Sequence, residues 1–117
     1  MQAEAVLFKA LSDPTRLRLA VLLAIRGETC VCDLAAALDE PDYKISRHLG
    51  ILRSGGLAET RRDGAWVYYR LVKGRSGLES CLHDCFRECL DEHPVVREDL
   101  LRLERASCAA GARCDGQ

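Results

Sequence analysis

Apolar residues recur at the three- to four-residue spacing of helices in six stretches of the chain, with short polar breaks between them. The second stretch carries clear end signals, because Asp13 followed by Pro14 favours a helix start and Arg26 followed by Gly27 favours a helix end. The predicted helices cover approximately residues 1–11, 13–26, 30–38, 42–54, 78–90 and 95–106.

The break between the third and fourth helices contains Glu40, Pro41 and Asp42. Pro41 has no backbone donor and pushes the residue before it away from helical angles. We therefore expect a tight turn between two short helices packed at a steep angle. This is the helix-turn-helix pattern, in which the N-terminal side chains of the second helix enter the major groove of DNA.

Two stretches of β-forming residues, 57–62 and 66–71, flank Asp63 and Gly64, a dipeptide that favours a tight hairpin. A chain of 117 residues, 48% of them hydrophobic, can bury one core. The predicted fold is mainly α with a β-hairpin, a winged helix-turn-helix, in a single domain over residues 1–106. Residues 107–117 are small and polar and are expected to form a flexible, cysteine-containing tail.

The formal net charge of −1 conceals two regions of opposite sign. Basic residues prevail from Lys44 to Arg75 and acidic residues from Ser76 to Glu104, so one face should attract phosphates. Within the predicted DNA surface, Arg47 could bind guanine in a bidentate manner, whereas His48 is expected mainly to pack structurally. Trp66 is expected to pack under the hairpin. The candidate DNA-binding residues are Tyr43, Lys44, Ser46, Arg47, His48, Arg53, Arg61 and Arg62.

Seven cysteines form an odd set in a chain whose start lacks the order of a secretory signal. We expect free thiols, a cytoplasmic location and no membrane partner, because no apolar run could span a bilayer. Cys30 and Cys32 offer two soft ligands two residues apart. Since residues i and i+2 of a regular helix do not face each other, the first turn of the third helix must distort to hold one ion. That distortion would shift the fourth helix.

The segments LFKALSDPTRLRLAVLL, ETCVCDL, KISRHLGILRSGGL and RRDGAWVYYRL occur in this order between about residues 6 and 72. In this respect the chain resembles the ArsR/SmtB family of metal-responsive winged-helix repressors, in particular its arsenic-sensing branch. The resemblance implies a homodimer on an inverted-repeat operator, with a DNA-binding core over about 13–72 and terminal helices, about 1–11 and 75–106, that form the dimer interface. The interface residues expected on this basis are Leu78, Leu82, Cys85 and Cys89.

The resemblance also implies that As(III) or Sb(III), bound to Cys30 and Cys32, acts as inducer, with no cofactor required for DNA binding. These ions prefer three thiolates, and the arsenic-sensing branch often supplies the third from the residue three positions after the second cysteine. This chain has Ala35 there. The candidates for a third ligand are Cys108 and Cys114 of the tail or an exogenous thiol.

Cys81, Cys85 and Cys89 follow one another at four-residue intervals, so neighbouring members of this row could chelate an ion. They fall within an apolar stripe, however, and we favour a role as small core residues in the expected dimer seam. The family's zinc-type site needs aspartate and histidine pairs on the last helices. The spacing of His83, Asp84 and His93 does not reproduce it.

Two other functions stay open on the sequence. The thiols could form a redox or persulfide switch on a DNA-binding repressor, which would require an accessible pair with a low pKa. Alternatively, the winged helix could contact protein rather than DNA. Enzyme activity is not expected, because the Cys-x5-Arg spacing of Cys81 and Arg87 lies in an amphipathic helix and not in a glycine-rich phosphate loop.

Overall fold

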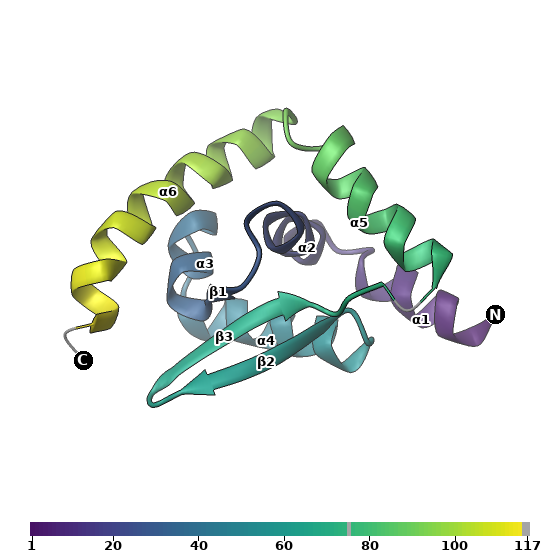
Figure 1. Ribbon diagram of the computed structural model, residues 1–117, viewed down its shortest axis with the longest axis horizontal. Coiled ribbons are helices and arrows are strands. Elements are labelled where there is room, and N and C mark those ends of the chain that lie inside the picture. Colours follow the sequence, from purple (N-terminus) through teal and green to yellow (C-terminus); the bar gives the residue numbers. More distant parts are fainter. Residues whose placement is uncertain (75, 116–117) are drawn as a thin grey trace.

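The computed structural model describes residues 1–74 and 76–115, with side chains described up to Ala106. It shows six helices and a three-stranded sheet within this part of the chain (Figure 1). No helix among the described residues is long and apolar enough to cross a membrane. The elements are α1 (Gln2–Ala10), α2 (Pro14–Arg26), β1 (Thr29–Cys30), α3 (Val31–Leu38), α4 (Asp42–Ser54), β2 (Ala58–Asp63), β3 (Trp66–Leu71), α5 (Gly77–Cys89) and α6 (Pro94–Asp115).

The central helix α2 begins and ends as its sequence predicts. The Asp13 carboxylate accepts hydrogen bonds from the backbone N–H groups of Thr15 and Arg16, and Gly27 follows the last helical residue. Leu19 and Leu22 of α2 are fully buried, since α3, α4, α5 and α6 all lie around this helix. The core that positions the other elements is therefore built on α2.

The helix-turn-helix consists of α3 and α4. Asp39 ends α3 in a left-handed conformation, with φ at 54°, and Pro41 precedes the first residue of α4 in an extended conformation. Ile45, Leu49 and Leu52 of α4 are completely buried, so the opposite side of this helix faces outward. The predicted turn and the predicted bounds of the fourth helix are confirmed.

The hairpin is formed by β2 and β3, which pair in an antiparallel manner from Ala58 opposite Leu71 to Asp63 opposite Trp66. Gly64, with φ at 62°, provides the positive φ that the tight connection requires. A third strand, β1, was not predicted from the sequence. It pairs with β3 through Thr29 and Cys30, giving the order β1-β3-β2.

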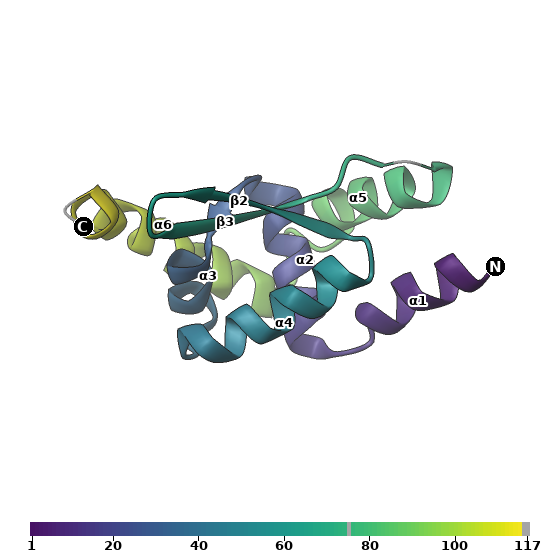
Figure 2. The ribbon, with the colours of Figure 1, turned by 90° about the horizontal axis from the view of Figure 1, so that it is seen from below.

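The terminal helices lie outside the helix-turn-helix. Helix α1 and the first turns of α5 lie at one end of the molecule, whereas α6 runs beside α3 towards the other end (Figures 1 and 2). Helix α6 continues to Asp115, although the sequence placed its end near Ala106. Arg102 of α6 donates a hydrogen bond to the carbonyl oxygen of Ala37 in α3, at 2.6 Å. The last helix is thereby attached to the helix that follows the two thiols.

The predicted core role of the cysteine row on α5 is wrong within this chain. His83 and Phe86 face the core, and Leu82 and Leu90 are partly buried against it. The three cysteines of the row, in contrast, are exposed: Cys81, Cys85 and Cys89. The apolar stripe seen in the sequence is wider than the side of α5 that α2 covers, so the thiols are left outside.

Candidate thiol site and DNA-binding surface

Cys30 and Cys32 lie together at the start of α3, with their sulfur atoms 2.9 Å apart. Cys30 is the last residue of β1 and has extended angles, φ −78° and ψ 155°, whereas Cys32 lies within the first helical turn. The i, i+2 argument for a regular helix does not apply to this pair, because only one of the two residues is helical. The prediction that the helix must distort before both thiols can hold one ion is therefore wrong.

The environment of the pair favours neutral thiols. Cys30 is buried, with 3% of its surface exposed, and Cys32 is half-buried. Burial raises the pKa of the Cys30 thiol well above its usual range, and the contact with Cys32 and the nearby Asp33 carboxylate raise it further. A bound ion would have to displace these protons, so its affinity must increase with pH.

Asp33 is a third potential ligand that the sequence argument did not identify. Its carboxylate Oδ1 lies 4.0 Å from the Cys32 sulfur, and the ligand atoms of Cys30, Cys32 and Asp33 all lie within 4.8 Å of one another. No second group of three such residues occurs in the part of the chain that the structure describes. The available signal was the acidic residue in the first turn of α3. Ala35, the position of the usual third thiol, is buried in the core.

The other predicted ligand candidates are not assembled here. The side chains of Cys108 and Cys114 lie outside the described residues. The zinc-type residues are engaged separately: Asp84 pairs with Arg87, and the Nδ1 atom of His93 accepts a hydrogen bond from the Val95 backbone. Cys81 and Arg87 lie on the helix α5, with no phosphate-cradling loop between them.

A cavity of about 350 Å³ connects the thiol pair to the predicted DNA-binding elements. Cys30 and Cys32 form one side of it, Tyr43 and Ser46 from the first turns of α4 another, and Trp66 from β3 a third. Trp66 is half-buried, so the expectation that it packs under the hairpin is confirmed. An ion bound to the thiols would therefore lie next to both the recognition helix and the hairpin.

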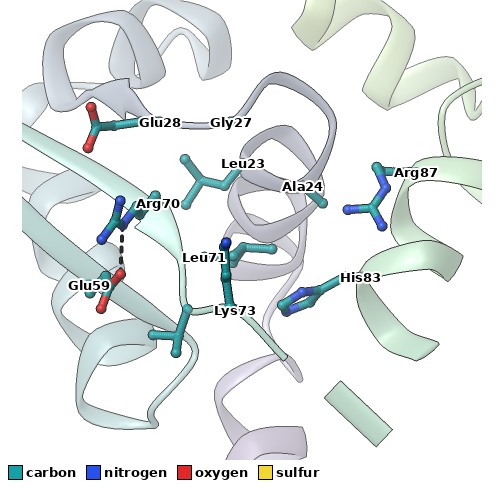
Figure 3. Close-up of a pocket in the computed structure, with 11 residues that line it drawn as sticks. Leu23, Ala24, Gly27, Glu28, Glu59, Arg70, Leu71, Lys73, His83 and Arg87 are labelled. Carbon is teal, nitrogen blue, oxygen red and sulfur yellow. Dashed lines mark hydrogen bonds and ion pairs between the residues drawn. The ribbon is translucent and has the colours of Figure 1, made fainter. Parts of the chain in front are cut away.

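A larger hollow, of about 780 Å³, lies between α2, the sheet and α5 (Figure 3). Arg70 and Glu59 on its wall pair with each other, with 2.6 Å between Nε and Oε2. His83 also lines it and is buried, and its Nε2 atom has no hydrogen-bond partner among the described residues. No thiol lines this hollow, so it is separate from the candidate ion site.

The outward side of α4 carries most of the predicted base-contacting residues. Tyr43, Ser46 and Arg47 are exposed, and Tyr43 retains 75% of its surface. Lys44 is half-buried and pairs with Glu40 at 3.0 Å. Arg53 is exposed at the last turn of the helix. The structure therefore leaves these side chains on one accessible helix face, apart from the charge of Lys44, which Glu40 balances.

His48 is not on that face, because 91% of its surface is buried, as its 9% exposure implies. Its Nδ1 atom lies 3.4 Å from Arg16 Nη1 and 4.0 Å from Asp13 Oδ2. Because a guanidinium can only donate, Nδ1 accepts this hydrogen bond. Burial lowers the pKa of His48, with Asp13 acting in the opposite direction. Its contacts are structural and link α4 to the start of α2.

The two hairpin arginines differ in their surroundings. Arg61 lies within β2, opposite Tyr68, and binds the Glu28 carboxylate with Nη2–Oε1 at 2.8 Å. Its guanidinium also lies 4.6 Å from the centre of the Tyr68 ring. Arg62 is exposed on the neighbouring position and opposes Val67. The charge of Arg61 is thus balanced within the protein, which leaves Arg62 as the better candidate for a phosphate contact.

A helix-turn-helix followed by a basic hairpin, with the recognition helix exposed, defines a winged helix-turn-helix DNA-binding protein. Residues 13–60 match the model of the bacterial regulatory protein arsR family. The arsenical resistance operon repressor of Escherichia coli K12 is 57% identical over 107 residues, which cover 92% of this chain and 90% of that protein. The chain belongs to the ArsR family.

Two further comparisons agree with this assignment. The arsenic resistance transcriptional regulator ArsR2 of Pseudomonas putida KT2440 is 45% identical over 98 residues, covering 83% of each chain. The solution structure of a homodimeric winged helix-turn-helix DNA-binding domain from Mycobacterium bovis, a possible ArsR-family regulator, superposes with a TM-score of 0.63. That domain is 34% identical, with coverage of 80% of this chain and 82% of the domain. The predicted family and fold class are confirmed.

Proposed function

We propose that this protein is a transcriptional repressor that binds an inverted-repeat operator as a homodimer and is released by As(III) or Sb(III). The observation that carries the proposal is the 2.9 Å contact between the Cys30 and Cys32 sulfurs, in a cavity that the recognition helix and the hairpin also line. Soft thiolates select thiophilic ions. The arsenic-related names of the most similar relatives agree with that chemistry. Such a repressor acts in the cytoplasm, where its operator is.

The coupling between ion and DNA follows from the two backbones that the thiols join. Cys30 is paired with Tyr68 of β3, and Cys32 belongs to the first turn of α3. Bonds from an ion to sulfur are about 2.3 Å long, as for zinc, so the ion must push the two sulfurs apart. That movement displaces β1, and with it the hairpin, relative to the start of α3. The side chains of Tyr43 and Ser46 at the shared cavity would follow.

The third ligand is expected to be a thiolate of Cys108 or Cys114, because trivalent arsenic is thiophilic and a carboxylate is a harder ligand. Helix α6 packs beside α3, which brings the last part of the chain towards the sensor end of the molecule (Figure 1). Asp33 is the alternative, since its carboxylate already lies beside the pair. An exogenous thiol is the third source.

The DNA contact is proposed to use the outward face of α4 and the hairpin. Arg47, Ser46 and Tyr43 would reach base edges, whereas Arg53 and Arg62 would bind phosphates. Lys44 and Arg61 would contribute less in the conformation described here, because Glu40 and Glu28 balance their charges. His48 would support α4 from inside.

The dimer is proposed to form through the terminal helices. Leu78 and Cys85 with Cys89 form an exposed strip on α5, next to the partly buried Leu82. Helix α1 leaves Val6 and Phe8 about half exposed at the same end of the molecule (Figure 2). Large exposed apolar side chains on two neighbouring helices are typical of an interface with a second copy.

A redox or persulfide switch is the second candidate. Its requirement was an accessible pair with a low pKa, and Cys30 is buried with a raised pKa. Ion binding fits this pair better, because an ion can displace both protons at once.

The test is an anisotropy titration with a labelled duplex from upstream of the protein's own gene, repeated with arsenite, antimonite, cadmium, zinc and hydrogen peroxide. We expect saturable, salt-sensitive binding that arsenite and antimonite reverse. Release by peroxide but not by arsenite would favour the redox switch. If the protein shows no saturable binding to this duplex, the third candidate, a protein-interaction module, replaces both repressor models.

A further inference from the structure

Three thiols outside the Cys30–Cys32 site lie along one side of α5. Cys81, Cys85 and Cys89 are four residues apart, and each is free and exposed in this chain. Residues i and i+4 of a helix lie one above the other, with their Cβ atoms about 5–6 Å apart. Successive thiols of this row therefore point to the same strip of surface.

Two of these thiols already contact each other. The thiols of Cys85 and Cys89 are hydrogen-bonded, so their sulfurs stand at the separation from which two ligands can hold one ion. A helix backbone keeps this pair in register, and little ordering is needed when an ion binds. The arrangement is that of a bidentate soft ligand on a rigid element.

The charges around the pair decide which ions suit it. The contact with Cys85 raises the pKa of Cys89, and the carboxylates of Glu88 and Asp91 contribute in the same direction. Negative neighbours oppose a bare thiolate but stabilise a positively charged ion between the sulfurs. A soft divalent cation therefore fits this site better than trivalent arsenic, which arrives as a neutral hydroxide.

We propose that Cys85 and Cys89, assisted by Cys81, form a second binding site for a soft divalent cation, of which Cd²⁺ is the probe. Binding replaces two S–H bonds by two metal–sulfur bonds and releases two protons for each ion. The site is distinct from the Cys30–Cys32 pair, because α3 and α5 lie on opposite sides of α2 (Figures 1 and 2). It does not depend on the proposed arsenic response.

The row also borders the strip of α5 that we propose as the dimer seam. Leu78 lies one turn before Leu82, and Cys85 and Cys89 continue the same strip. If two copies meet there, both rows would contribute sulfurs to one ion. The stoichiometry then decides between a site within one chain, with one ion per chain, and a shared site, with one ion per dimer.

The experiment uses the full chain with all other cysteines replaced by serine, at positions 30, 32, 108 and 114, so that only the α5 row remains. Cd²⁺ is titrated in the presence of a phosphine reductant, and binding is followed by sulfur-to-metal charge-transfer absorption. We expect saturation at one ion per chain or per dimer. The matched control carries serine at all seven positions and should show no such absorption.

Single substitutions then locate the ligands. Cys85→Ser and Cys89→Ser should each lower the Cd²⁺ affinity by on the order of a hundredfold, at or beyond the upper end of what loss of a supporting partner costs. Cys81→Ser should have a smaller effect. Circular dichroism of each variant checks that α5 still forms. If the chain that retains only the α5 row binds Cd²⁺ no better than the chain without cysteine, the proposal is wrong, whatever arsenite does at the operator.

Discussion

Arg18 on α2 and Asp99 on α6 form a bidentate ion pair across 81 positions of the sequence, with 2.9 Å from Nε to Oδ2 and 2.7 Å from Nη2 to Oδ1. The Asp99 side chain is completely buried, and Arg102 adds a third hydrogen bond to it at 2.8 Å. Arg102 also binds the Ala37 carbonyl. This cluster holds α6 against both the central helix and the sensor helix.

Replacing Asp99 by alanine should therefore destabilise the protein strongly. Two guanidinium groups would lose their common acceptor, and breaking a buried ion pair costs about 3–5 kcal/mol. We expect the lower end of this range, because Arg18 is 28% exposed and can reach water. Urea denaturation at a fixed protein concentration measures the change. The matched control is Glu98→Ala at the exposed neighbouring position. An equal effect of the two substitutions would show that the cluster contributes little.

Cys30→Ser and Cys32→Ser should preserve operator binding and remove the response to arsenite. Neither thiol belongs to the exposed face of α4, so the affinity for DNA should not change. The arsenite concentration needed for release should increase by at least about a hundredfold, because each variant loses a direct ligand. The anisotropy titration measures both quantities, with Cys81→Ser as the control thiol. A variant that is folded but no longer binds DNA would indicate a structural role for the thiols.

The hairpin arginines should differ in their contribution to DNA binding. Arg62→Ala should reduce the slope of log K against log salt concentration by about 0.9, the value for one lost phosphate contact. Arg61→Ala should reduce it less, because Glu28 already neutralises that guanidinium. Binding isotherms at several salt concentrations give the slopes. Equal reductions would mean that Arg61 leaves Glu28 when DNA is bound.

The third ligand can be identified by comparing two variants. The double substitution Cys108→Ser with Cys114→Ser should weaken arsenite-induced release by at least about tenfold, on the scale of lost metal-site partners. Asp33→Asn keeps the shape of the side chain and should have a smaller effect. Sulfur coordination measured by X-ray absorption should decrease only in the double variant. The opposite pattern would assign the third position to Asp33, and no effect of either would favour an exogenous thiol.

Two buried histidines should make the protein less stable in mild acid. Burial is the main cause that lowers the pKa of both His48 and His83 below the usual value near 6.5. Below that value the unfolded chain binds more protons than the folded chain, so stability decreases as the pH falls. Their contribution is complete above about pH 6.5 and declines below it.

Urea midpoints between pH 7.5 and pH 5.5, a range that avoids most carboxylate titration, measure this dependence. His83→Gln should reduce the loss of stability over this range, because glutamine does not titrate. The exposed His93 provides the control, and His93→Gln should leave the pH dependence unchanged. A wild-type midpoint that does not change with pH would contradict the prediction.

The sequence by itself determined the order and the bounds of most elements, because the signals for them are local. Asp13 and Pro14 at the start of α2, Pro41 before α4 and Gly64 in the hairpin each act through backbone angles of the same few residues. The spacing of apolar residues then placed the buried sides of α2 and α4 correctly. The adjacency of Cys30 and Cys32 to the recognition helix was visible on the same basis.

Only the tertiary structure decided how the site residues meet. Cys30 is extended because β1 pairs with Tyr68, some forty positions away, and this pairing brings the two sulfurs together. Arg61 is neutralised by Glu28, a residue from the loop after α2. The row at Cys81 is exposed because α2 covers a narrower side of α5 than the apolar stripe suggests. Each outcome depends on contacts between distant segments, which composition and periodicity along the chain do not specify.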